Sequence, residues 1–150
     1  MNTRPAEPSR LLLVEDDPND VELIRLSLNS YHFARQIDIV HDGQQAIQYL
    51  LGDSHSPATS PLPRLVLLDL KLPRLSGIEV LQTLRAHERT RKLVIVVMTS
   101  SAEDSDLNAC YELGTNSYIV KPLNFQEYSE VARQVSYYWM VLNRPPIFSV

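Results

Sequence analysis

Residues 11–18 read Leu-Leu-Leu-Val-Glu-Asp-Asp-Pro, four apolar residues followed directly by three acids and a proline. An unbroken apolar run of this kind is typical of a strand that is buried on both faces of a parallel sheet. Asp17 and Pro18 are favoured at the start of a helix, as its N-cap and first helical residue. The stretch therefore predicts a buried strand that passes directly into a helix, with Glu15 and Asp16 at the turn between them.

The same order of strand and helix recurs four more times along the chain. Apolar strand runs are predicted at 37–40, 65–68, 93–98 and 117–120, and each is followed by a segment with apolar residues at helical spacing. The last helix is predicted to run from Asn124 to Leu142. Five successive βα units indicate the α/β class, with a doubly wound five-stranded parallel sheet and helices on both faces.

Length and composition indicate one domain. The chain has 150 residues, a formal net charge of −4 and a single cysteine. This charge gives no general attraction to nucleic acid or to an anionic membrane. No apolar run is long enough for a membrane anchor, and the unpaired Cys110 excludes an intrachain disulfide, so we expect a cytoplasmic protein. We predict a flexible segment at 1–9, a domain at 10–143 with an exposed Ser/Pro-rich loop at 53–64, and a tail at 144–150.

Four of the five predicted strands end in residues that carry chemistry. Glu15 and Asp16 follow the first strand, Asp69 the third, and Thr99 the fourth, while Lys121 follows the fifth. Parallel strands bring their carboxyl ends to one edge, where sites in such folds gather. Three adjacent carboxylates resist joint ionisation unless a cation intervenes, and hard oxygen ligands suit Mg²⁺. With Lys121 and Thr99 as donors to a phosphoryl group, the set indicates phosphoryl transfer onto a carboxylate.

Several short motifs together resemble the response-regulator receiver (CheY-like) domain, which has a flavodoxin-like fold. They are Val14-Glu15-Asp16-Asp17, residues 67–73, Gly77, Thr99-Ser100 and Val120-Lys121-Pro122. The resemblance covers roughly residues 10 to 142. It implies Asp69 as the phosphoacceptor, a Mg²⁺ site, a switch and a cis peptide bond before Pro122. The implied Mg²⁺ ligands are Asp16, Asp69, the Lys71 carbonyl oxygen and, through water, Glu15; the implied phosphoryl contacts are Thr99 and Lys121, and the implied switch residues are Thr99 and Tyr118.

The resemblance also indicates a kind of partner. The 53–64 loop and the tail from Val131 to Pro146 look like those of small single-domain regulators that serve cyanobacterial phytochromes, which are light-sensing histidine kinases. The partner implied is therefore a sensor histidine kinase such as a phytochrome. We expect a signalling protein that assists its own phosphorylation and dephosphorylation, rather than an enzyme. Without an attached output domain, it would act through a changed surface or by relaying the phosphoryl group.

Two other classes of protein are weighed against this interpretation. A phosphatase with an aspartyl-phosphate intermediate usually has an acid two residues after the nucleophile, but Lys71 stands there. A nucleotide- or flavin-binding module uses a Gly-rich or Ser/Thr-rich phosphate loop, and the four glycines form no such motif. Neither class fits the strand-end residues as well as the receiver domain does.

The last predicted helix carries more apolar surface than one sheet can cover. Tyr128, Val131, Val135 and Tyr138/Trp139 share one seam, which Leu142 extends, and the end at 137–142 is apolar all round. Because one helix buries one stripe, the remaining surface predicts a homodimer through this helix and the neighbouring face. The alternative is that the tail folds back and covers the patch within one chain.

Overall fold

A computed structural model describes residues 10–30, 34, 36–58 and 61–148 of the chain. The predicted flexible segment 1–9 lies outside the described residues. The elements alternate as the sequence predicts. They are β1 (Arg10–Val14), α1 (Pro18–Asn29), β2 (Gln36–Val40), α2 (Gly43–Leu51), β3 (Leu65–Leu68), α3 (Gly77–Ala86), β4 (Ile95–Thr99), α4 (Asp104–Glu112), β5 (Ser117–Val120), α5 (Phe125–Tyr137) and a π-helical turn η1 (Tyr138–Leu142).

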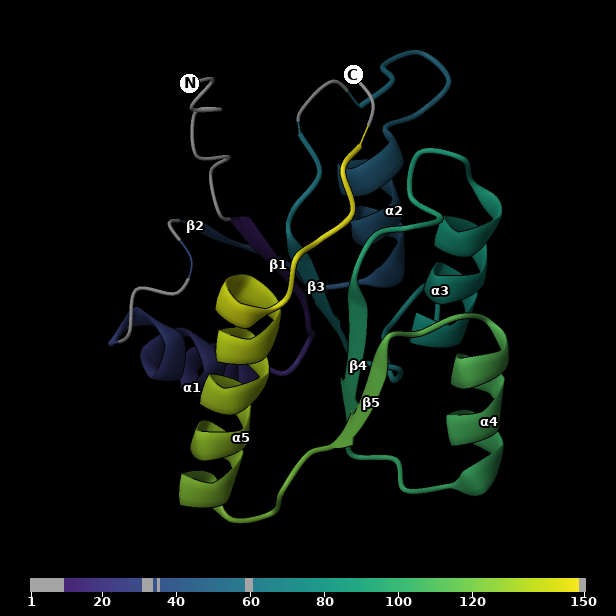
Figure 1. The fold of residues 1–150 in the computed structure, drawn as a ribbon. Helices are drawn as coiled ribbons and strands as arrows, with labels where there is room; N and C mark the ends of the chain where they lie inside the picture. Colours follow the sequence, from purple (N-terminus) through teal and green to yellow (C-terminus); the bar gives the residue numbers. More distant parts are fainter. Residues whose placement is uncertain (1–9, 31–33, 35, 59–60, 149–150) are drawn as a thin grey trace, which may run out of the picture.

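The five strands form one parallel sheet in the order β2-β1-β3-β4-β5. Helices α1 and α5 cover one face, and α2, α3 and α4 cover the other (Figure 1). The predicted doubly wound α/β fold is confirmed. None of the helices within the described part of the chain has the length and apolarity to cross a membrane.

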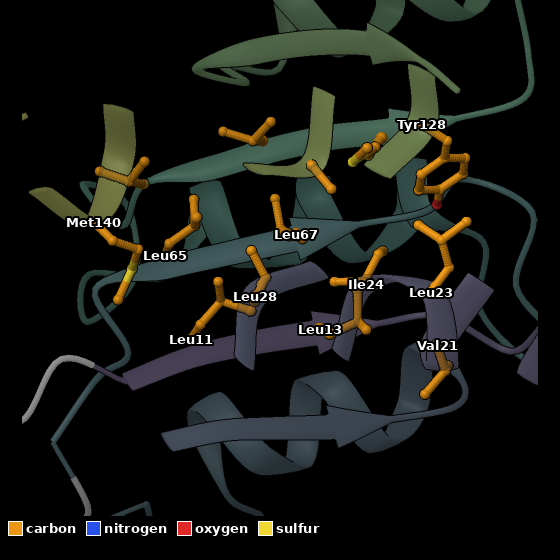
Figure 2. Close-up of a cluster of buried hydrophobic side chains, with 14 residues drawn as sticks. Leu11, Leu13, Val21, Leu23, Ile24, Leu28, Leu65, Leu67, Tyr128 and Met140 are labelled. Carbon is orange, nitrogen blue, oxygen red and sulfur yellow. The ribbon is translucent and has the colours of Figure 1, made fainter. Parts of the chain in front are cut away.

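Two apolar clusters fill the spaces between the sheet and the helices. One combines alternate strand residues such as Leu11, Leu13 and Leu67 with the inner stripes of α1 and α5 (Figure 2). The other combines the intervening strand residues, such as Leu12 and Val66, with α2, α3 and α4. Because β1, β3 and β4 are buried on both faces, their sequences are unbroken apolar runs apart from Arg10 at the start of β1 and Thr99 at the end of β4.

Side-chain caps fix where the helices start. The Asp17 carboxylate accepts a hydrogen bond of 2.8 Å from the Asn19 amide, as predicted for the residue before Pro18. Asp42 caps α2 in the same way. Ser76 and Glu79 form a complete capping box at the start of α3, which the spacing of residues 76–79 predicts. Each cap sets the direction in which its helix leaves the edge of the sheet.

Two boundaries differ from the sequence-based prediction by more than one residue. β4 begins at Ile95 rather than Leu93, because Leu93 closes a turn onto the Thr90 carbonyl oxygen. The last α-helix ends at Tyr137 rather than Leu142, and residues 138–142 form the wider π-helical turn. The Asn143 amide donates to the Tyr138 carbonyl oxygen at 2.7 Å to close this turn, which places Met140 in the core.

Arg64, at the end of the 53–64 loop, holds the end of η1. Its guanidinium group donates to the carbonyl oxygens of Asn143 at 2.8 Å and Trp139 at 3.4 Å. Beyond Asn143 the chain crosses the edge of the sheet opposite to the carboxyl ends of the strands (Figure 1). Phe148 then packs against the cluster on the α2–α4 side.

Most of the predicted seam of the last helix faces inward. Tyr128 is buried, and Val131, Val135 and Trp139 pack partly buried against the same cluster. The placement of Tyr138 and Leu142 on this seam is wrong, because residues 138–142 turn as a π-helix and leave both side chains exposed on the outer side with Tyr137 and Val141. As far as residue 148, the tail leaves these side chains exposed. Any interface at this helix therefore uses the outer residues, and Trp139, with its partly buried ring, belongs to the core.

Candidate functional site

The carboxyl edge of the sheet brings the predicted site residues together. Backbone hydrogen bonds between neighbouring strands continue beyond the last residue of each strand. The Glu15 amide donates to the Val40 carbonyl oxygen, and the Asp69 amide donates to the Val14 carbonyl oxygen. The Lys121 amide donates to the carbonyl oxygen of Thr99 at 2.7 Å. These bonds fix the backbone of each residue next to a neighbouring strand.

Glu15, Asp16 and Asp69 form an acidic cluster. Each offers a carboxylate oxygen, and these oxygens lie within 4.8 Å of one another. Glu15 and Asp69 are buried, whereas Asp16 is exposed. Carboxylate oxygens that converge from one open side suit Mg²⁺, which keeps part of its water shell. The donor set therefore fits a divalent hard cation.

The Lys121 ammonium group is the cationic centre of the site. Its Nζ lies 3.1 Å from Glu15 Oε2, 3.1 Å from Asp69 Oδ2 and 2.8 Å from Asp20 Oδ2. The Lys121 side chain is only 8% exposed. Because an ammonium group has three N–H donors, these three carboxylates use all of its hydrogen-bonding capacity.

Burial and charge shift the pKa values of this cluster in different directions. Burial, with Asp69 beside it, raises the pKa of Glu15 to about 9. Burial alone would raise the pKa of Asp69, but the Glu15 carboxyl, the Lys121 ammonium and the Thr99 hydroxyl outweigh it and hold that pKa below its usual value. Burial likewise would lower the pKa of Lys121, yet its bond to Asp20 and the charges of Asp69 and Glu15 raise it. Of the two buried acids, Asp69 is therefore the stronger acid.

The Asp69 carboxylate is held by the backbone that follows it. Its Oδ1 accepts from the amide of Leu70 at 2.7 Å and lies 3.4 Å from the amide nitrogen of Lys71. Gly77 allows this loop to close, because a Cβ there would lie 2.2 Å from the Asp69 carbonyl oxygen. The Lys71 side chain is exposed beside the site.

Thr99 and Tyr118 lie on the side of the cluster formed by β4 and β5. Thr99 is fully buried, and its Oγ1 accepts a hydrogen bond of 3.3 Å from the Ser101 amide. The Tyr118 hydroxyl donates to the Ser101 carbonyl oxygen at 2.9 Å. Thr99 and Tyr118 thus contact the same residue of the β4–α4 loop.

The implied cis peptide bond before Pro122 is wrong for this structure. The backbone has no cis peptide bond among the described residues, so the Lys121–Pro122 bond is trans. The position of the Lys121 side chain follows instead from its three ion pairs and from the backbone bond to Thr99.

Asp20 was missed by the sequence-based prediction. It lies in the first turn of α1, directly before the inward-facing Val21. An available signal was the position of this turn, since α1 starts three residues after Glu15 and therefore begins at the carboxyl edge. A cavity of about 280 Å³ opens beside the Asp20–Lys121 pair. Its other lining residues are Leu23, Ser100, Pro122, Leu123, Phe125 and Tyr128.

Comparison with known proteins places this arrangement in a family. The family model described as the response regulator receiver domain matches residues 11–133. The probable methanogenesis regulatory protein FilR2 of Methanothrix harundinacea is 38% identical over 140 residues, which span 93% of this chain and 89% of FilR2. Response regulator Rcp1 of Synechocystis is 32% identical over 133 residues, spanning 89% of this chain and 90% of Rcp1.

Solved structures agree with the sequence relatives. The Mn²⁺-bound form of Rcp1 has a TM-score of 0.86 at 31% identity, over 93% of this chain and 100% of that one. The phosphorylated cyanobacterial phytochrome response regulator RcpA has a TM-score of 0.85 at 27% identity, over 93% of this chain and 99% of that one. With its sheet order, its acidic cluster and these relatives, the chain belongs to the response regulator receiver domain family.

Proposed function

We propose that Asp69 accepts a phosphoryl group from the phosphohistidine of a sensor histidine kinase, in the presence of Mg²⁺. The observation that carries this proposal is the ion pair between Lys121 Nζ and Asp69 Oδ2, at 3.1 Å, directly beside the acidic cluster. An ionised carboxylate, a fixed cation and a candidate metal site are the groups that phosphoryl transfer requires.

The transfer step follows from the groups at this edge. An oxygen of Asp69 forms a bond to phosphorus as the P–N bond of the phosphohistidine breaks, and the released imidazole nitrogen takes a proton. Lys121 and Thr99 donate to the phosphoryl oxygens, where negative charge is concentrated. Glu15, Asp16, Asp69 and the Lys71 carbonyl oxygen would hold Mg²⁺, which supplies charge neutralisation when bound.

We test this step with acetyl phosphate and MgCl₂, following the intact mass of the protein and mapping the modified residue. We expect wild type to gain one phosphoryl group on Asp69, and Asp69→Asn to gain none. Asp104→Asn, which changes an exposed carboxylate in the first turn of α4, should behave as wild type. Excess EDTA should stop the labelling. Full labelling of Asp69→Asn, or labelling that survives EDTA, contradicts the proposal.

We further infer that the donor is a kinase of the phytochrome class and that the two proteins meet in the cytoplasm. The likeness to RcpA, a phytochrome response regulator, supports this partner. In this role the protein is a signalling component that assists its own phosphorylation and dephosphorylation. The test compares phosphotransfer to this chain from a phosphorylated phytochrome kinase and from a histidine kinase with another sensor. Equal rates contradict the assignment of the partner.

We also propose that two copies associate through the outer side of α5 and η1. Tyr138 and Leu142 are 50% and 57% exposed there, and Tyr137 and Val141 extend the apolar patch. Aromatic and aliphatic side chains of this kind are typical of interface cores. In sedimentation at micromolar concentration, with and without phosphorylation, we expect wild type to be a dimer in at least one state. Tyr138→Glu/Leu142→Glu should be monomeric in both states, whereas Leu26→Glu, at an exposed leucine of α1, should sediment as wild type does. A wild type that stays monomeric in both states contradicts the dimer.

A further inference from the structure

The Asp20–Lys121 ion pair is the shortest contact of the Lys121 ammonium group. Asp20 Oδ2 lies 2.8 Å from Nζ, compared with 3.1 Å for the oxygens of Glu15 and Asp69. The Asp20 side chain is 24% exposed, so its carboxylate stands at the rim of the site rather than inside it. Asp20 therefore contacts the functional lysine from a different side than the two buried acids.

The three carboxylates around Lys121 differ in their relation to the candidate metal site. Among the described residues, Glu15 and Asp69 belong to the acidic cluster with Asp16, whereas Asp20 does not. A divalent cation at the cluster would share Glu15 and Asp69 with Lys121 and would repel its ammonium group. Asp20 alone of the three would keep its full charge for Lys121.

We propose that Asp20 is a positioning residue that keeps Lys121 at the phosphorylation site while a divalent cation occupies the acidic cluster. This inference rests on the proposed phosphorylation of Asp69. The two N–H donors that point to Glu15 and Asp69 become free to turn to phosphoryl oxygens, while the third stays on Asp20. Asp20 thereby allows Lys121 and the metal to act on the same carboxylate without displacing each other.

The first test measures Mg²⁺ affinity by calorimetry, without any phosphoryl donor, in a double-mutant cycle. Asp20→Asn leaves Lys121 dependent on the metal ligands, so we expect Mg²⁺ to bind about tenfold more weakly, the effect of losing a charge-assisted hydrogen bond. In a Lys121→Met background the same change has an effect below about twofold, because the competing ammonium group is gone. If Asp20 acted only through its negative charge, Asp20→Asn would lower the Mg²⁺ affinity equally in both backgrounds. That result would overturn the proposal.

The second test measures the rate of phosphorylation by acetyl phosphate at saturating Mg²⁺. We expect Asp20→Asn to be about tenfold slower than wild type and Asp20→Glu to recover most of the rate. Glu22→Gln removes the same charge from an exposed position of α1 and keeps the wild-type rate. If Asp20→Asn and Glu22→Gln are phosphorylated at equal rates, the proposed role of Asp20 is overturned, but the proposed function is not. A wild type that gains no phosphoryl group on Asp69 overturns the proposed function as well.

Discussion

The hydroxyl of Tyr118 donates a hydrogen bond of 2.9 Å to the main-chain carbonyl oxygen of Ser101. This bond joins β5 to the loop that follows Thr99, while the Tyr118 ring packs against the cluster on the α2–α4 side. A displacement of the loop would break the bond or move the ring. The two predicted switch residues, Thr99 and Tyr118, are therefore connected through Ser101.

Replacing Tyr118 by Phe should lower the free energy of unfolding by about 1 kcal/mol, the usual contribution of one hydrogen bond. The ring remains in place, so the loss reports the bond to Ser101 alone. Urea denaturation of the unphosphorylated protein measures it. Tyr111→Phe, at a tyrosine that is 51% exposed on α4, is the control with little expected change. Equal stability of the two variants would show that the bond does not form in solution.

The stability of the metal-free protein should fall as pH rises from about 4.5 towards 9. Burial raises the pKa of Glu15 from 4.5 to about 9, so in this window folded Glu15 holds a proton that the unfolded chain has lost. The lowered pKa of Asp69 changes the stability only at pH values below its ordinary pKa of 3.8. The raised pKa of Lys121 changes the stability only above its ordinary pKa of 10.5. Thermal unfolding in EDTA across this range measures the slope.

The control for the Glu15 titration is Glu15→Gln, which keeps the shape of the side chain and has no proton to exchange. Its stability should change less with pH between 5 and 9 than that of wild type. If wild type and Glu15→Gln show parallel profiles, the raised pKa of Glu15 is refuted.

Gly77→Ala should destabilise the fold by about 2 kcal/mol, in the range typical of overpacking. The added Cβ would lie 2.2 Å from the Asp69 carbonyl oxygen and 2.6 Å from Leu70 Cα, both in the backbone. The movement that relieves this clash displaces Asp69, so the rate of phosphorylation falls as well. Ser76→Ala, which removes only the α3 cap, costs about 1 kcal/mol and serves as the neighbouring control. A Gly77→Ala variant with wild-type rate and stability would contradict the tight approach.

Arg64→Met should weaken the attachment of η1 and lower the free energy of unfolding by about 1–2 kcal/mol, because two carbonyl oxygens lose their donor. Limited proteolysis should then cut near residue 143 faster than in wild type. Arg25→Met, at an exposed arginine of α1, is the matched control. Unchanged cleavage in Arg64→Met would show that the tail is held by other contacts.

The sequence predicts the elements whose signals are local. Unbroken apolar runs indicate buried strands such as β1 and β3. Asp17, Asp42 and Ser76 are residue types that cap helices, and they stand where α1, α2 and α3 begin. The gathering of Glu15, Asp69, Thr99 and Lys121 follows from the parallel topology alone, since all four are at or just after the carboxyl ends of strands.

Features that depend on contacts between distant segments could not be predicted. The start of α1 puts Asp20 at the carboxyl edge, but its ion pair with Lys121, 101 residues later, is visible only in the folded chain. The π-helical turn η1 is closed by Asn143, and Arg64, 79 residues before Asn143, holds its end.

The crossing of residues 143–148 over the amino edge of the sheet has a practical consequence. This segment and the Asp69 edge are separated by the length of the strands, roughly 15 Å for four or five residues. Ile147 is 66% exposed, so an Ile147→Cys variant would give a suitable anchor for a dye or for attachment to a sensor chip. A protein immobilised there would present its phosphoacceptor edge outward to a kinase in solution, so binding and phosphoryl transfer could be followed on one oriented surface.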